Sequence, residues 1–131
     1  MTDLRQRLKG TRDGLLHLHK SLLDSERAAY ERDVARITTT GQYLRLVLED
    51  PWFQWLRELS QFVVLIDETL EQKDPPATNE DLERLLAQAR ALLTPDEGGV
   101  GFARHYFEIL QRDPAAVLAH RDMIKVMAAL E

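Results

Sequence analysis

The apolar residues of this chain recur at steps of three and four positions along nearly its whole length. The densest run lies between Glu49 and Leu70 and contains both tryptophans of the sequence. This spacing puts apolar side chains on one face of an α-helix, whereas a half-buried strand alternates at every second position. The pattern therefore predicts an all-α fold: five to six helices forming an up-down bundle, with a long N-terminal helix and a central, aromatic-rich helix.

The central helix is expected to begin at Pro51. Asp50 can accept hydrogen bonds from the first amides, and a proline at the first helical position has no amide to leave unpaired. Segment 62–66 is apolar on almost all sides, so we expect neighbours to cover it from several directions. The main apolar stripe of this helix is Trp52, Leu56, Leu59, Val63, Ile66 and Leu70.

The first helix is predicted to run from about Asp3 to about Ile37, because this stretch lacks proline and keeps a heptad-like apolar spacing. Its length, on the order of 50 Å, exceeds what a compact bundle of this size needs. Two explanations remain open at this point. Either Gly10 and Gly14 break the start of the helix, or the helix projects into a partner.

Proline and glycine clusters divide the rest of the chain. A short helix is expected at 42–49, and segment 73–79, with two consecutive prolines, is the clearest linker. Thr78 and Asp81 have the spacing of a capping box at the start of the next helix. The glycine-rich loop 94–101 carries two acidic residues and no lysine, so it lacks the pattern of a phosphate-binding loop.

A short aromatic helix at 101–110 follows this loop. Asp113 and Pro114 then repeat the start signal of the central helix and open the last helix. The apolar face expected for the last helix consists of Val117, Arg121, Ile124, Met127 and Ala128.

Length and composition set the limits of the interpretation. We expect one domain over residues 1–131, because a single hydrophobic core suffices at this size. The absence of cysteine excludes disulfides and zinc sites of the cysteine type. A net charge of −5 argues against general nucleic-acid binding, and no run reaches the roughly 20 apolar residues of a membrane span. The charged N-terminus is unlike a signal peptide, so we expect a soluble, cytoplasmic protein.

Four ionisable residues of the first helix lie seven positions apart within its apolar stripe: Arg12, His19, Glu26 and Asp33. We call this set the polar seam. Neighbouring members are about 10.5 Å apart along the axis, so each needs partners from other helices. We interpret the seam mainly as interhelical salt bridges and hydrogen bonds, and we predict that Glu26 is buried and bonded to an Arg or His. The partners considered are Arg57, Asp67, Arg104, His105, His120 and Arg121.

A ligand or metal site is the alternative for the same region. His19, His105 and His120 come from three different helices, and Glu26 offers a carboxylate, which is how helical bundles assemble such sites. Because the repeated Glu-x-x-His and the His-Glu-x-x-His motifs are both absent, we assign no metal, no cofactor and no catalytic residue. The aromatic residues that could wall an accompanying pocket, or simply fill the core, are Trp52, Trp55 and Tyr106.

The segments SERAAYER at 25–32 and DPWFQWLRELSQFVVLIDE at 50–68 resemble bacterial all-helical proteins of uncharacterised function. This resemblance implies a bacterial helical domain and carries no activity to any residue. From the residues themselves we expect a non-enzymatic bundle that acts by self-association, most simply as a homodimer, or by binding another protein. The alternative is a small-ligand- or metal-binding bundle with an internal His/Glu/aromatic pocket.

Overall fold

The computed structural model describes residues 3–129, and this part of the chain is entirely helical, with no strand. The elements, in order, are α1 (Leu4–Asp33), α2 (Thr40–Glu49), the 3₁₀ turn η1 (Gln54–Leu56), α3 (Arg57–Glu71), α4 (Asn79–Leu92), α5 (Phe102–Arg112) and α6 (Pro114–Ala129). The all-α bundle expected from the sequence is confirmed. No helix within the described range is long and apolar enough to cross a membrane.

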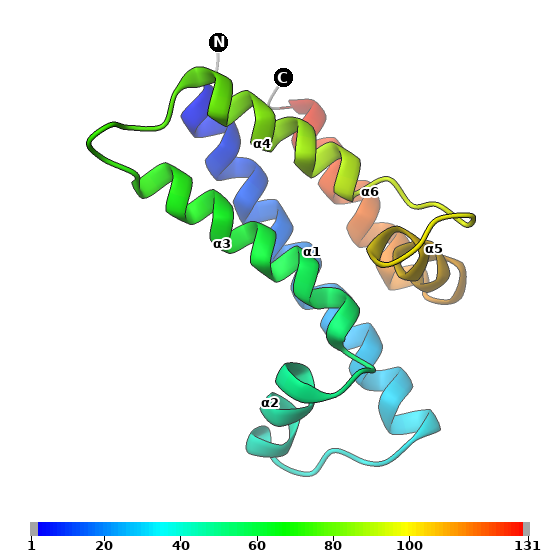
Figure 1. Cartoon of the computed structure of the whole chain (residues 1–131). Coiled ribbons are helices and arrows are strands. Elements are labelled where there is room, and N and C mark those ends of the chain that lie inside the picture. The colour runs from blue at the N-terminus through cyan, green and yellow to red at the C-terminus, as the bar shows by residue number, and fades with distance from the viewer. Residues whose placement is uncertain (1–2, 130–131) are drawn as a thin grey trace.

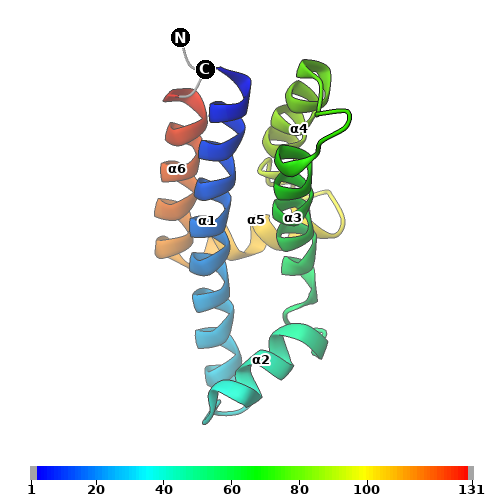
Figure 2. The same ribbon diagram turned by 90° about the vertical axis from the view of Figure 1, so that its left-hand side faces the viewer.

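Helix α1 forms the middle of the bundle and packs against α3, α4 and α6 (Figure 1). Seen from the side, α6 lies along one flank of α1, the α3–α4 pair lies along the other, and α5 crosses between them (Figure 2). The leucines on the inward side of α1, such as Leu8, Leu15 and Leu22, are fully buried in the main core. The buried face of α1 therefore organises the whole molecule.

Helix α1 is continuous, so the first of the two explanations for its length, a break at Gly10 and Gly14, is wrong. Asp3 caps the helix by accepting a hydrogen bond from the amide of Gln6 at 3.0 Å. Gly14 lies against α6, where an added Cβ would come within 2.6 Å of the Met123 sulfur. Its missing side chain allows two helices to approach closely, and this contact outweighs its low helix propensity.

The C-terminal end of α1 is covered by residues that follow it in the same chain. Tyr30, Ile37 and Phe53 are buried together in a second, smaller core, against which Tyr43 and Val47 of α2 pack. Helix α2 closes this end of the molecule (Figure 2). Helix α1 ends at Asp33, four residues before the predicted Ile37.

The predicted start of the central helix at Pro51 is also wrong, because α3 begins only at Arg57. The Asp50 carboxylate accepts from the amide of Trp52 at 2.9 Å, which makes a local turn rather than a helix cap. The turn places Phe53 in the second core. Tertiary burial of aromatic side chains has overridden a local helix signal.

The predicted stripe of α3 is buried from Leu59 to Leu70, but the other sides of the helix are not covered. Val64 and Leu65 are both exposed on its outer face. The expectation that neighbours cover segment 62–66 from several directions is therefore wrong. Only α1, η1 and α4 pack extensively on this helix.

Two local start signals behave as predicted. Thr78 and Asp81 form a reciprocal capping box, with N···O distances of 2.9 and 3.1 Å. At the start of α6, the Asp113 carboxylate accepts from the amide of Ala115 at 2.9 Å. Both signals lie in loops that bury no aromatic ring, so no tertiary contact overrides the local helix signal.

The face predicted for α6 is wrong, since Val117 and Ile124 are exposed whereas Ala116 and Met123 are buried. Helix α6 carries apolar residues on almost all sides, so periodicity alone could not select the inward face. Packing against α1 determines which face of α6 points inward, because Gly14 leaves room for the Met123 side chain.

Candidate functional sites

Glu26 forms the most connected polar group of the polar seam. Only 5% of this residue is exposed, and its Oε1 accepts a hydrogen bond from the Arg112 guanidinium of α5. Its Oε2 accepts from the Trp55 indole at 3.3 Å, and its backbone carbonyl accepts from the Trp52 indole at 3.2 Å. The predicted burial and pairing of Glu26 are confirmed, although Arg112 was not among the partners considered.

This arrangement fixes the Glu26 carboxylate as a cross-link between α1, the turn after α2, and α5. Each carboxylate oxygen already accepts a hydrogen bond from a side chain. A general base instead needs an oxygen that reaches the proton of a substrate. The geometry therefore suits an interhelical ion pair better than proton transfer.

The other members of the polar seam have separate surroundings. Arg12 donates to Asp67 of α3 at 2.7 Å, one of the predicted pairings, and this hydrogen bond raises the pKa of the guanidinium. His19 is half-buried, and desolvation lowers its pKa. Asp33 is exposed at the last position of α1 and pairs with its neighbour Arg32 at 3.4 Å, so it lies outside the interhelical contacts. The seam does not form one continuous site.

A row of aromatic rings crosses from η1 to α6. The Trp55 ring stacks on His105 and packs against Phe102, with centroid distances of 5.5 and 5.3 Å. Phe102 then contacts Tyr106 at 5.4 Å, and Tyr106 contacts His120 at 5.3 Å. These rings pack on one another, so Trp55 and Tyr106 belong to a filled core.

Trp52 is separate from this row. Its ring contacts Tyr30 edge-on, with centroids 5.7 Å apart, in the second core. The three aromatic residues considered as pocket walls, Trp52, Trp55 and Tyr106, are therefore divided between two clusters. The structure does not bring them together around one cavity.

Tyr106 and the half-buried His120 form a hydrogen-bonded pair between α5 and α6. Tyr106 is fully buried, and its hydroxyl lies 2.5 Å from Nδ1 of His120. Burial raises the pKa of Tyr106 and lowers the pKa of His120. Both shifts favour the neutral forms of the two side chains, which share one hydrogen bond.

The histidines of the sequence do not converge on a metal site. His105 is exposed and its Nδ1 donates to the carbonyl of Gly101 at 2.9 Å, within the first turn of its own helix. Among residues 3–129, no group of three His, Asp or Glu side chains is placed to hold a metal ion. The alternative ligand set therefore has no common centre in the structure. Its members are His19, Glu26, His105 and His120.

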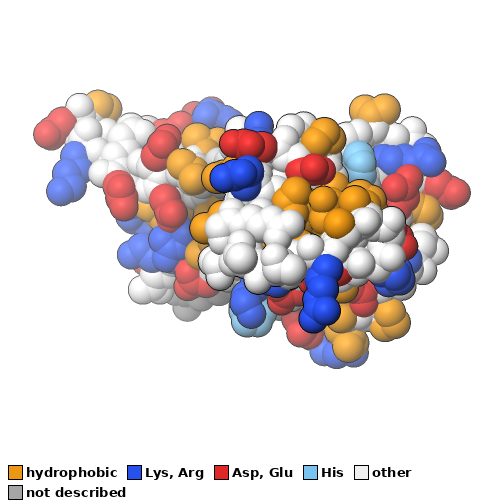
Figure 3. Space-filling model, turned by 90° about the horizontal axis from the view of Figure 1, so that it is seen from below, with side chains coloured by type: hydrophobic (Ala, Val, Ile, Leu, Met, Phe, Trp, Pro, Cys, Tyr) orange, Lys and Arg blue, Asp and Glu red, His pale blue; other side chains and the backbone are white. Residues whose placement is uncertain are grey.

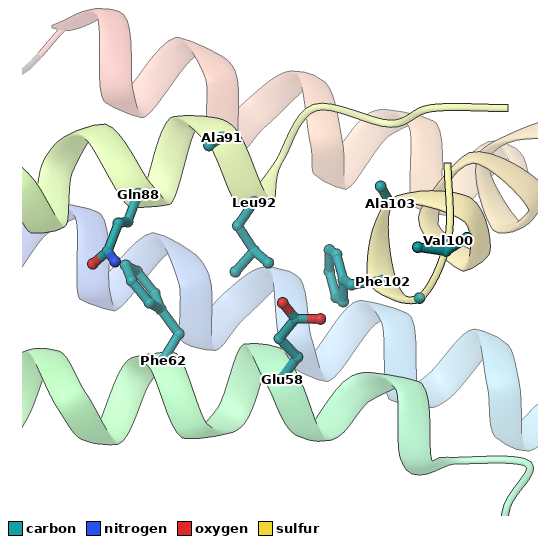
Figure 4. Close-up of a pocket in the computed structure, with 9 residues that line it drawn as sticks. Glu58, Phe62, Gln88, Ala91, Leu92, Val100, Phe102 and Ala103 are labelled. Atoms are coloured by element: carbon teal, nitrogen blue, oxygen red, sulfur yellow. The ribbon is translucent and has the colours of Figure 1, made fainter. Parts of the chain in front are cut away.

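A pocket of about 580 Å³ lies between α3, α4 and the start of α5 (Figure 4). Its apolar walls include Phe62, Leu92 and Phe102, and Glu58 and Gln88 are its polar members. The sequence did not reveal this site, because three elements far apart in the chain contribute to it. The only sequence signal was the aromatic start of α5 after a glycine-rich loop.

The surface of α6 is the second feature missed by the sequence. Besides Val117 and Ile124, it exposes Leu118 and Val126. Depressions run along both of its sides, one of about 480 Å³ against α1 and one of about 290 Å³ against α4. Helix α6 therefore presents an apolar, grooved surface.

Other apolar side chains are exposed at the end of the molecule closed by α2. Leu44 and Leu48 lie on the outer side of that helix. Viewed from this end, hydrophobic side chains gather near the middle of the face, with charged side chains of both signs around them (Figure 3).

Comparisons of the chain with protein-family models, curated proteins and solved structures give no match. The functional argument therefore rests on geometry and chemistry.

Proposed function

We propose that the protein is a non-catalytic helical bundle that associates with a second copy of itself through α6. The observation that carries this proposal is the composition of α6. A helix that is apolar on almost all sides is normally covered on almost all sides. Helix α6 packs closely on α1 alone, with a smaller contact to α5, and leaves its outer half exposed.

The exposed half of α6 has the make-up of a contact surface. Leu118, which is 51% exposed, lies near the middle of the outer face, with Val117 and Ile124 on one flank and Val126 on the other. Scattered single apolar residues on a surface need no explanation, but several large ones exposed on one helix are typical of an interaction site. A second helix laid along α6 would cover Leu118 and one of the two flanks.

The charges of α6 complement a second copy in antiparallel orientation. Arg121 and Asp122 are exposed neighbours at the centre of Pro114–Ala129. A twofold axis passing beside them pairs each Arg121 with the partner's Asp122 while the two helices overlap along their whole length. Such self-complementarity is what a symmetric interface requires.

Charge reversal at the two central positions tests this arrangement. Arg121→Asp or Asp122→Arg alone creates two like-charge contacts per dimer, and we expect the dissociation constant to rise at least about tenfold. The double variant carrying both changes restores opposite charges across the axis and regains the parent affinity. Sedimentation equilibrium over a range of protein concentrations measures all three variants and the parent.

Two further variants separate α6 from the other apolar surfaces. Leu118→Glu puts a charge in the middle of the interface and is expected to give a monomer. Leu65→Glu alters another exposed leucine, on the outer face of α3, and should leave the dimer intact. A parent protein that is monomeric at all concentrations overturns the proposal, as does a dimer that Leu65→Glu disrupts and Leu118→Glu spares.

A further inference from the structure

We propose that the pocket between α3, α4 and α5 binds a small apolar molecule that carries a protonated amine. The pocket volume of about 580 Å³ falls within the range of small-molecule sites, roughly 300–1,000 Å³. Such sites combine apolar walls with a few polar groups that orient the ligand. Both parts are present here.

The apolar walls come from three different elements. In the close-up, Phe62 of α3, Leu92 of α4 and Phe102 of α5 border the same space (Figure 4). Phe102 is held in place by ring contacts with Trp55 at 5.3 Å and Tyr106 at 5.4 Å. These ring contacts fix the position of the wall, which lowers the entropy that binding must overcome.

The rim of the pocket includes an unusually exposed apolar residue. Val100 lies in the loop before α5 and is 87% exposed, the highest value among the large apolar residues described. Gly101 follows with a positive φ of 62°, a conformation that a glycine adopts without strain, and turns the chain into α5. A ligand seated in the pocket would remove Val100 from water.

Glu58 gives the pocket its charge preference. Its carboxylate points toward the space between Leu92 and Phe102 (Figure 4). Several other acidic side chains of the bundle are paired with arginines, such as Asp67 with Arg12. The Glu58 side chain is exposed and forms no hydrogen bond or ion pair with any residue in the described range 3–129. Its carboxylate is therefore free to pair with a cationic group on the ligand.

Other ligand charges fit less well. A neutral apolar molecule would draw water away from the Glu58 carboxylate without offering it a partner, which disfavours binding. An anionic ligand would meet that carboxylate at close range. One feature acts in the opposite direction. The first turn of α5 has no side-chain cap, so its free amides favour an anion. The test therefore compares all three kinds of ligand.

The two tryptophans of the chain allow a direct test by NMR. Trp55 packs on the pocket wall Phe102, whereas Trp52 lies in the second core. We expect 2-phenylethylammonium to shift the indole N–H signal of Trp55 saturably and to leave that of Trp52 unchanged. 2-Phenylethanol should bind about two to five times more weakly, which is the effect of an exposed ion pair, and 3-phenylpropionate more weakly still.

Substitutions in the pocket test the role of the carboxylate. Glu58→Gln keeps the shape of the side chain and is expected to bring the affinity for the amine down to that for the alcohol. Glu68→Gln, on the same helix but outside the pocket, is the matched control and should change nothing. Phe62→Ala should weaken both ligands. The proposal is overturned by tighter binding of 3-phenylpropionate, by an amine affinity unchanged in Glu58→Gln, or by shifts confined to Trp52.

Discussion

At the scale of single residues, the ion pair between Glu26 and Arg112 is strongly asymmetric. Glu26 is almost completely buried, whereas 42% of the Arg112 side chain is exposed. Removing the arginine leaves a buried carboxylate without its charged partner. Removing the carboxylate leaves a guanidinium that can turn toward water.

The asymmetry gives a quantitative prediction. We expect Arg112→Ala to lower the free energy of unfolding by about 3 kcal/mol, because a buried charge loses its partner. Glu26→Gln should lower it by only about 1–2 kcal/mol, because the amide oxygen can still accept from Trp55. For a domain of this size, the first change corresponds to a fall of roughly 10 °C in Tm. Thermal unfolding followed by circular dichroism measures both changes.

Arg104→Ala provides the comparison for an exposed pair. Arg104 is bonded to Glu108 at 3.0 Å on the surface of α5, so its loss should lower the stability by less than about 1 kcal/mol. If Arg112→Ala melts no lower than Arg104→Ala, then Glu26 is solvated in solution and the ion pair does not hold α5 against α1.

At the scale of helices, local signals predicted the elements better than they predicted their neighbours. The capping box at Thr78 and the start at Asp113 were predictable because each requires only contacts within a few residues. The same dipeptide at Asp50 and Pro51 failed because the rings that follow it are drawn into cores built by α1 and α2. No local pattern contains that information.

The candidate sites also differ in whether local patterns could predict them. Seven-residue spacing on α1 was enough to predict that Glu26 is buried and paired, because periodicity shows which side of a helix faces inward. It could not identify Arg112, since the crossing of α5 over the bundle depends on tertiary packing. The pocket beside Glu58 was beyond prediction for the same reason, because three separate helices form its walls.

The contact between α1 and α6 provides a prediction about these two helices. At Gly14, an added Cβ is too close only to the flexible end of Met123 and makes ordinary contact with Val126, so Gly14→Ala should change the stability by less than about 1 kcal/mol. Gly14→Leu has no such space and should destabilise the fold by about 2–3 kcal/mol by forcing α6 outward. Urea unfolding measures both variants. Gly41→Ala, in α2 with nothing within 4 Å, is the control that measures the gain in helix propensity alone.

The stability of the Gly14→Leu variant also tests how closely α6 packs on α1. A Gly14→Leu variant as stable as the parent would mean that α6 does not approach α1 as closely as described. The outer face of α6 could then be buried by a shift of this helix within one chain. The proposed dimer depends on α6 remaining packed on α1. The urea unfolding of the Gly14 variants and the sedimentation of the α6 variants should therefore be interpreted together.

At the scale of the whole molecule, α1 connects two cores of unequal size, and Glu26 lies where they meet. Trp52 belongs to the smaller core and Trp55 packs on the larger one, yet both indoles donate hydrogen bonds to Glu26. The end closed by α2 is thereby tied to the main bundle. We expect the two cores to unfold together, as single domains of this size commonly do.

This cooperativity means that any buried titratable group affects the stability of the entire fold. Burial lowers the pKa of both His19 and His120 below the ordinary value of 6.5. Between 6.5 and the lowered values, the unfolded chain binds more protons than the folded one. The free energy of unfolding therefore falls as the pH drops through this window, and it is fully retained above the window.

We predict that the urea midpoint of the parent protein decreases between pH 7.5 and pH 5.5. His120→Asn removes one of the two groups and keeps an acceptor near the Tyr106 hydroxyl, so its midpoint should decrease less over the same interval. Combining it with His19→Gln should reduce the slope further. A double variant that loses as much stability on acidification as the parent would place the responsible groups elsewhere in the molecule, and the neutral, tyrosine-bonded state of His120 would not contribute to holding α5 and α6 together.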